Sequence, residues 1–250
     1  MEIRAANLCY SYGGHRVLHD LTWHVRQGVT GLLGPSGAGK TTLLSLLVTI
    51  NRPRTGRILV GENDLGTAAG RQAARKVIGY LPQHFSLVRG MRVRDTVAYA
   101  AWLNGVPYTW SFRAAGDALV QVGLTDQEHC RVHNLSPGMR QRLGIASALA
   151  HEPAVLVLDD PTGGLEASRR RQLRETVHEI SRDRTVVLST QRVENVAHLC
   201  DDIAILDEGR MRFSGSSREL TSLVECTAED AGSQVERAYD HFLTCGSPDG

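Results

Sequence analysis

A glycine-rich segment with the spacing G-x-x-x-x-G-K-[S/T] runs from Gly34 to Thr41. Placed between a strand and a helix, such a loop points backbone N–H groups and the positive helix end toward phosphate. Lys40 is one of only two lysines in this arginine-rich chain, and it is expected to reach the β- and γ-phosphates of a nucleotide. The Thr41 hydroxyl is expected to ligate Mg²⁺. The phosphate-binding residues are therefore predicted to be Gly34, Pro35, Ser36, Gly37, Ala38, Gly39, Lys40, Thr41 and Thr42.

Two neighbouring carboxylates follow the apolar run Val155 to Leu158. A strand that ends in a carboxylate beside a phosphate loop places Asp159 where it can hold the Mg²⁺ shell. Asp160 is expected to orient or deprotonate the attacking water. The alternative is a buried strand whose acidic end caps the chain from Thr162 onward, and the phosphate loop upstream favours the metal role.

A second anion-binding surface is predicted at Ser136 to Arg142, immediately before an expected helix from Leu143 to Ala150. Ser136 is a good N-cap residue, and small neighbours leave N–H groups exposed at a helix start. One phosphate loop with two phosphate-binding surfaces indicates that two chains meet head to tail, each offering its second surface to the other's nucleotide.

The elements that position these residues alternate between strands and helices. A mostly parallel sheet covered on both faces is the α/β arrangement that this alternation predicts. Ile3 to Val25 alternates loosely around a turn, and Val93 to Ala150 has helical periodicity and is inserted between strands, which indicates a separate lobe. Helices are expected at Thr41–Val48, Ala167–Ile180 and Gln234–Leu243, and strand-like runs are Val29–Leu33, Arg57–Val60, Ala154–Leu158, Thr185–Leu188 and Ile203–Leu206.

The length, composition and net charge of the chain limit the class of protein to which it can belong. With 250 residues the chain forms one large or two small domains, and no apolar run reaches the roughly 20 residues needed to span a bilayer. A formal net charge of +1 argues against a nucleic-acid partner. The histidines show no metal-binding spacing, so no metal other than nucleotide-bound Mg²⁺ is expected. We expect a cytoplasmic protein whose scattered cysteines are free thiols: Cys9, Cys130, Cys200, Cys226 and Cys245.

The chain resembles the ATP-binding subunits of ATP-binding cassette (ABC) transporters over nearly its whole length. Tyr12 stands where this family stacks an aromatic ring on adenine, with Tyr10 as the rival ring, and Gly34 to Thr42 matches the Walker A loop. Gln83 matches the Q-loop glutamine, which senses Mg²⁺ and links the cassette to its membrane partner. The resemblance implies ATP and Mg²⁺ as cofactors, with Mg²⁺ held by Thr41, Gln83 and Asp159.

Four further segments carry the resemblance. Ser136 to Arg140 corresponds to the signature motif, so that Ser136 and Gly138 would face the ATP of a second chain, and Asp159 is similar to the Walker B aspartate. Gly163 to Glu166 stands at the D-loop and Leu188 to Gln191 at the switch loop. The sequence Gly-Met-Arg-Gln-Arg after Pro137 resembles that of cassettes in the branch that serves ABC-2 type exporters.

Departures from the family pattern fall on its hydrolytic parts. Asp160 replaces a glutamate that is one methylene longer, and a misplacement of about 1 Å can cost on the order of 10²-fold in rate. Gln191 replaces the switch histidine; it can donate a hydrogen bond but carries no positive charge. Pro137 replaces the first signature glycine and removes an N–H, while Met139 and Glu166 replace a glutamine and an aspartate. We therefore expect ATP binding to be intact. The residues expected to carry out hydrolysis are Asp160, Gln191 and Gln83, and we expect this hydrolysis to be weakened.

The resemblance implies an α/β P-loop NTPase (RecA-like) core with a mostly parallel sheet, an N-terminal antiparallel β portion and an inserted α-helical subdomain. The ATP-binding domain is expected at 1–224, with its core at 1–83 and 153–224 and its helical subdomain at 84–152; a helix and tail follow at 225–250. The implied function is an ATPase subunit that couples ATP binding and hydrolysis to transport. Its partners would be an integral membrane permease, contacted by residues after Gln83, and a second identical or different cassette. The chain would then lie on the inner face of the cell membrane.

Two other functions stay open at this point. One is a cytosolic ABC ATPase that serves a machine other than a transporter; the absence of a long coiled-coil insertion and the near-neutral charge disfavour it. The other is a regulatory cassette that closes on ATP without useful hydrolysis, which Asp160 and Gln191 motivate.

Overall fold

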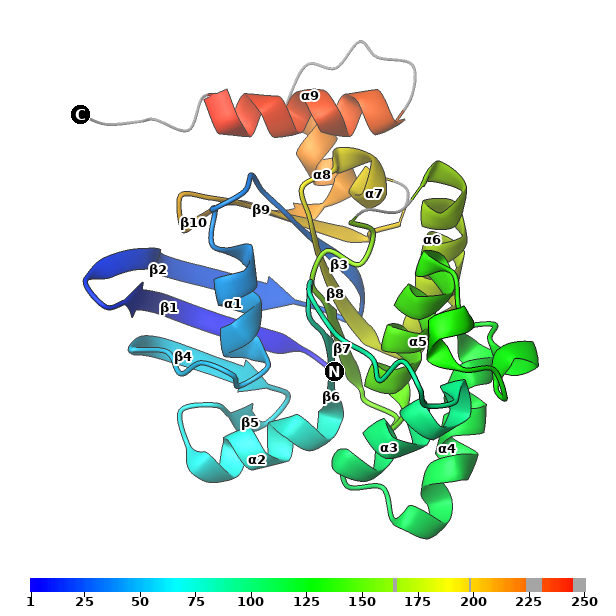
Figure 1. Ribbon diagram of the computed structural model, residues 1–250. Coiled ribbons are helices and arrows are strands. Elements are labelled where there is room, and N and C mark those ends of the chain that lie inside the picture. Colours follow the sequence, from blue (N-terminus) through cyan, green and yellow to red (C-terminus); the bar gives the residue numbers. More distant parts are fainter. Residues whose placement is uncertain (164–165, 198, 224–230, 245–250) are drawn as a thin grey trace.

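An antiparallel sheet forms the amino-terminal part of the computed structural model, which describes residues 1–163, 166–197, 199–223 and 231–244 (Figure 1). Its strands lie in the order β2-β1-β4-β5, and β1 and β2 form a hairpin through Gly13 and Gly14. The expected antiparallel portion is confirmed. The bounds are β1 (Ile3–Tyr12), β2 (His15–Val25), β4 (Thr55–Val60) and β5 (Asn63–Asp64).

A six-stranded, mostly parallel sheet forms the centre of the molecule, as the alternation of elements predicts. The four pairs from β9 across to β6 are parallel, and only β10, at one edge, is antiparallel to its neighbour. All residues of β7 and β8 are buried, because helices cover both faces of the sheet. Across the sheet the strands are β10 (Arg210–Ser216), β9 (Asp202–Asp207), β3 (Gly28–Leu33), β8 (Thr185–Thr190), β7 (Val155–Leu158) and β6 (Ile78–Leu81).

Helix α1 (Lys40–Leu47) lies between the two sheets and is buried on almost all sides (Figure 1). Its leucines share one hydrophobic core with residues from β1, β2 and β4 on one side and from β3, β7, β8 and β9 on the other. The phosphate loop that precedes α1 is therefore clamped between the end of β3 and a helix that cannot shift without opening this core.

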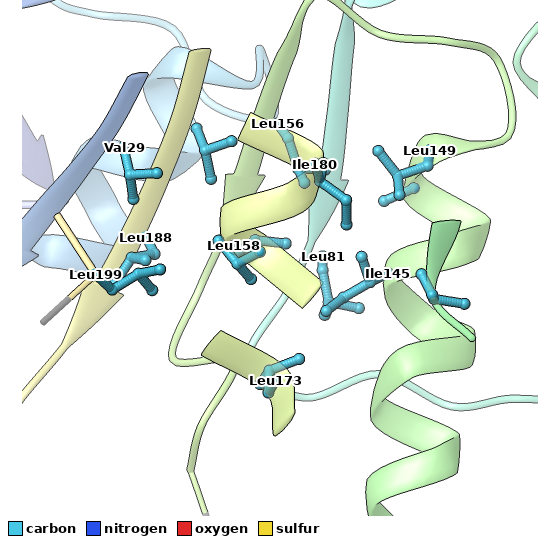
Figure 2. Close-up of a cluster of buried hydrophobic side chains, with 14 of the residues drawn as sticks. Val29, Leu81, Ile145, Leu149, Leu156, Leu158, Leu173, Ile180, Leu188 and Leu199 are labelled. Carbon is cyan, nitrogen blue, oxygen red and sulfur yellow. The ribbon is translucent and has the colours of Figure 1, made fainter. Parts of the chain in front are cut away.

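A second core fills the opposite face of the central sheet. Figure 2 shows leucines of β6 and β7 packed against Ile145 and Leu149 of α5 and against Leu173 and Ile180 of α6. The inserted helices stand on this side of the molecule (Figure 1). They are α3 (Val93–Leu103), α4 (Tyr108–Gln121) and α5 (Pro137–Leu149), with 3₁₀ turns at Thr125–Gln127 and Val132–Asn134; α6 (Ala167–Ser181) and α7 (Val193–Ala197) follow β7 and β8.

The structure moves the start of one expected helix and adds elements that were not expected. Helix α5 begins at Pro137, not at Leu143, because proline at the first helical position fits behind the Ser136 cap. Helix α2 (Ala68–Val77), capped by Thr67, and strand β10 were not expected. The chain ends in α8 (Ser217–Ser222) and α9 (Ala231–Thr244), the latter resting on α7 and α8.

Two expectations about the whole chain can be compared with the described residues. None of the helices in these residues is both long and apolar enough to cross a bilayer. Cys9, Cys130 and Cys200 are free thiols, as expected, while Cys226 and Cys245 lie outside the described residues.

Candidate nucleotide-binding site

The loop between β3 and α1 has a backbone that only glycine allows at two points. Gly39, the N-cap of α1, has φ 102°, in the left-handed region that disfavours other residues. A Cβ atom on Gly34 would lie 2.1 Å from the carbonyl oxygen of Leu206, so the loop passes directly against β9. The Gly209 amide also donates to the carbonyl of Ala38 at 3.0 Å. The loop is thus fixed by backbone contacts on both sides.

Lys40 folds over this loop. Its Nζ atom donates to the carbonyl oxygens of Gly34 and Pro35, both at 2.7 Å. Burial lowers the pKa of the Lys40 ammonium, and the nearby charges of Asp159 and Asp160 oppose this shift. The two bonds of Nζ go to neutral carbonyl oxygens, and low solvent access strengthens the attraction between its charge and an anionic phosphate.

A pocket of about 220 Å³ opens above the loop and gathers residues from five separate segments. The carboxyl ends of β6, β7 and β8 all meet there, as expected for a ligand site in a parallel α/β sheet. Ten of the predicted site residues line it: Ser36, Gly37, Gly39, Lys40, Thr41, Thr42, Gln83, Asp159, Asp160 and Gln191.

Asp159 is held by a serine on the neighbouring strand. The Ser189 hydroxyl donates to Asp159 Oδ1, and Ser189 Oγ also accepts the backbone N–H of Asp160 at 2.9 Å. Asp159 is 2% exposed, and its Oδ2 atom has no hydrogen-bond partner among the described residues. A buried, unpartnered carboxylate oxygen beside Thr41 fits a Mg²⁺ ion or a water of its shell.

Asp160 is half-buried and has φ 43°, a left-handed conformation that aspartate tolerates better than most residues. Burial, followed by the charge of Asp159, raises the pKa of the Asp160 carboxyl. A Cβ atom on Gly163 would lie 2.7 Å from Asp160 Oδ2, so this glycine leaves room for the carboxylate. A carboxyl with a raised pKa at the mouth of a phosphate pocket is suited to take a proton from water.

The pocket does not collect all predicted residues. The rings of Tyr12 and Tyr10 meet edge to face at 5.0 Å; Tyr12 is 51% exposed, whereas Tyr10 packs against the core between the sheets. Ser136 and Gly138 lie elsewhere, at the start of α5, while Gly34, Pro35 and Ala38 form the loop without lining the cavity.

Three further residues line the pocket. Sequence reasoning gave no role to Val17, and it placed Ser189 and Thr190 in the switch loop without a role of their own. Ser189 and Thr190 are polar residues at the end of a buried strand, which was a usable signal. Val17 on β2 gave none, because nothing in a sequence shows that this strand returns to the loop. In the predicted D-loop, residues 164 and 165 lie outside the described residues.

The second predicted anion surface has the expected cap. The Ser136 hydroxyl accepts the N–H of Met139 at 3.3 Å, and Pro137 occupies the first helical position. A Cβ atom on Gly138 would lie 3.2 Å from Cδ of Arg169, so the stem of this α6 side chain packs on the signature segment. The surface is solvent-facing and lies outside the pocket of its own chain.

Comparison with known proteins agrees with this geometry. A family model described as ABC transporter matches residues 18–163. An uncharacterized ABC transporter ATP-binding protein, YxlF of Bacillus subtilis, is 34% identical over 216 residues, covering 86% of this chain and 70% of the relative. The sulfate/thiosulfate import ATP-binding protein CysA of Mesorhizobium japonicum is 35% identical over 228 residues, covering 88% and 65%. The structure of cbiO1 from Clostridium perfringens, part of an ABC transporter complex, superposes with a TM-score of 0.79 at 26% identity, covering 94% and 98%.

Proposed function

The chain belongs to the ABC transporter family as an ATP-binding subunit that energises transport through a membrane permease, and we propose that it binds ATP and Mg²⁺ in the pocket above the Gly34–Thr41 loop. One observation carries the proposal. Lys40 and Thr41 at the start of α1 and Asp159 just after β7 line one pocket of about 220 Å³, and Asp159 Oδ2 has no hydrogen-bond partner in the described part of the chain.

Each group in the pocket has a role in this proposal. Lys40 and the α1 amides bind the phosphates, and Thr41, Gln83 and Asp159 hold Mg²⁺. The exposed ring of Tyr12 stacks on adenine. When bound, Mg²⁺ neutralises phosphate charge and orients the γ-phosphate. Asp160 accepts a proton from the attacking water at its carboxylate.

The two lysines of the chain allow a matched test. Lys40→Ala removes a buried ammonium from the phosphate loop, whereas Lys76→Ala removes an exposed one from α2. Lys40→Ala should abolish saturable binding of labelled ATP with magnesium, and Lys76→Ala should leave it unchanged. Unchanged affinity in the Lys40 variant would refute the site.

Hydrolysis is proposed to be slow. Asp160 is shorter than the family's glutamate, and Gln191, an exposed side chain at the pocket rim, supplies no positive charge to the γ-phosphate. The alternative supported by the same residues is a regulatory cassette that closes on ATP without turnover. Comparing ATP-induced dimerisation with steady-state turnover separates these two functions.

A second cassette is proposed to complete the site. Ser136 and Gly138 lie at a helix start that does not line the pocket of their own chain, which supports a second chain as the source of such a surface at the nucleotide. If that partner has intact catalytic residues, hydrolysis occurs mainly at the site that uses the partner's Walker B group. The sequence from Gly138 to Arg142 supports assignment to the ABC-2 exporter branch.

The permease is proposed to dock in a groove of about 400 Å³ between α2, α3 and α5. Phe85 and Leu87, which follow the Q-loop glutamine, line it together with Ile50 at the end of α1. The cassette then lies on the inner face of the membrane. The proposed units remain a core at 1–83 and 153–224, a helical subdomain at 84–152 and a tail at 225–250. Residues 224–230 and 245–250 lie outside the described residues.

A further inference from the structure

A buried amide connects two segments of the pocket that the chain leaves far apart. Asn195, on α7, is 1% exposed. Its Nδ2 atom lies 2.7 Å from the hydroxyl of Thr162 and 3.2 Å from the hydroxyl of Thr190. Thr162 and Thr190 are themselves 5% and 1% exposed, so solvent does not compete for these bonds.

The two threonines stand at functionally placed positions. Thr162 follows the Asp159-Asp160 pair after one proline, and Thr190 immediately precedes Gln191. The Thr190 hydroxyl also accepts the backbone N–H of Arg192 at 3.1 Å, which fixes the turn on the far side of Gln191. A single side chain is thus bonded to the segment after the carboxylates and to the segment that presents the switch residue.

Packing alone does not explain why an asparagine occupies position 195. Its Oδ1 atom is buried and has no hydrogen-bond partner among the described residues, a state that costs stability. Either orientation of the amide joins both threonines, because a hydroxyl can donate or accept. An apolar side chain of similar size would fill the site without this cost, but it would leave both hydroxyls unbridged.

We infer that Asn195 is a positioning residue, which holds the Gln191 segment in a fixed relation to the segment that follows Asp159 and Asp160. The inference rests on the proposed function, since it assigns Asn195 a part in ATP turnover. It does not give Asn195 a contact with nucleotide, and ATP affinity should not depend on it.

Two substitutions of Thr162 separate hydrogen bonding from packing. Thr162→Val keeps the shape and removes the hydroxyl, while Thr162→Ser keeps the hydroxyl and removes a methyl group. We expect Thr162→Val to lower kcat for ATP about tenfold, the equivalent of about 1.4 kcal/mol, with KM within twofold. Thr162→Ser should stay within about twofold of the wild type. A packing role predicts the reverse order, because a lost methyl group leaves a cavity.

Amide hydrogen exchange of the nucleotide-free full chain provides a readout that is independent of activity. Residues 189–192 should exchange about tenfold faster in Thr162→Val and at the wild-type rate in Thr162→Ser. Asn195→Leu should behave like Thr162→Val, and Asn63→Ala, which removes an amide that donates to Val60 in the antiparallel sheet, should change neither readout. If Asn195→Leu does not fold, the Thr162 pair decides.

Equal exchange and equal kcat in the two Thr162 variants, or valine better than serine, would overturn the inference. Failure of the wild-type chain to bind ATP is a different result. It would remove the proposed function, while the exchange data would still report whether the buried amide holds residues 189–192.

Discussion

The hydroxyl of Ser189 is predicted to be the main support of the Asp159 carboxylate and of the backbone at Asp160, and Ser189→Ala tests this. Ser189 is fully buried on β8. Its hydroxyl donates to Asp159 Oδ1 and accepts the N–H of Asp160 at 2.9 Å. Alanine would leave both oxygens of Asp159 without a partner in the described structure, since Oδ2 already has none.

The magnitude follows from these two bonds. A buried hydrogen bond to a charged group contributes about 1.5–3 kcal/mol, and an unsatisfied buried N–H costs about 1 kcal/mol more. The loss should therefore be about 3 kcal/mol. For a chain of 250 residues, at about 2–4 °C per kcal/mol, this lowers Tm by about 6–12 °C.

The assay is thermal unfolding of the nucleotide-free chain, so that the shift reports the fold and not ligand binding. Ser111→Ala is the matched control. Ser111 is 1% exposed, but its hydroxyl bonds only the carbonyl of Tyr108 in its own helix, at 2.8 Å. Its removal should cost under about 1 kcal/mol. Equal shifts in the two variants would refute the view that Ser189 supports the Asp159 carboxylate and the backbone at Asp160.

Two more predictions concern Asp160. The double change Asp160→Glu, Gln191→His should raise steady-state ATP turnover by about 10²-fold in a correctly assembled complex, and the absence of a gain would show that other steps limit hydrolysis. Because burial and Asp159 raise the pKa of Asp160, its ionised form destabilises the folded chain above the raised pKa, and this cost disappears below the ordinary value. Asp160→Asn should therefore raise Tm at about pH 7.5, and the gain should shrink as the pH falls toward about 4, as measured by fluorimetry over a pH series.

The features that sequence reasoning placed correctly depend on local spacing. The Gly34–Thr41 pattern needs only a strand before it and a helix after it, and both were readable from apolar runs. The strands around Val155 and Thr185 were equally clear, because a strand buried on both faces is a continuous apolar run. The α/β class and the placement of Asp159 near Lys40 follow from these elements, whereas Gln83, which lines the same pocket, was assigned from the family resemblance.

The features that sequence reasoning missed depend on contacts between distant segments. Helix α2 has only ten residues, buries only Ala74 and has mostly alanine as its apolar residues, so its low hydrophobicity gave no clear helix signal in the sequence. Strand β10 has no fully buried residue and is held as an edge strand by β9. The bond from Ser189 to Asp159 crosses between adjacent parallel strands, and the strand order β8-β7-β6 cannot be read from one sequence.

The contrast between an intact binding loop and altered catalytic positions has a physical basis. At Gly34 any side chain would collide with the Leu206 carbonyl at 2.1 Å, so this position admits no other residue unless the backbone shifts. Gln191 is exposed at the pocket rim, so other side chains fit there at small cost in stability. A cassette can therefore change its hydrolytic residues while its phosphate loop, its carboxylate support at Ser189 and its core stay the same. Under the proposed function, the geometry of the phosphate loop is constrained by the fold, whereas the residue at position 191 is not, so ATP binding would be kept while the rate of hydrolysis could vary.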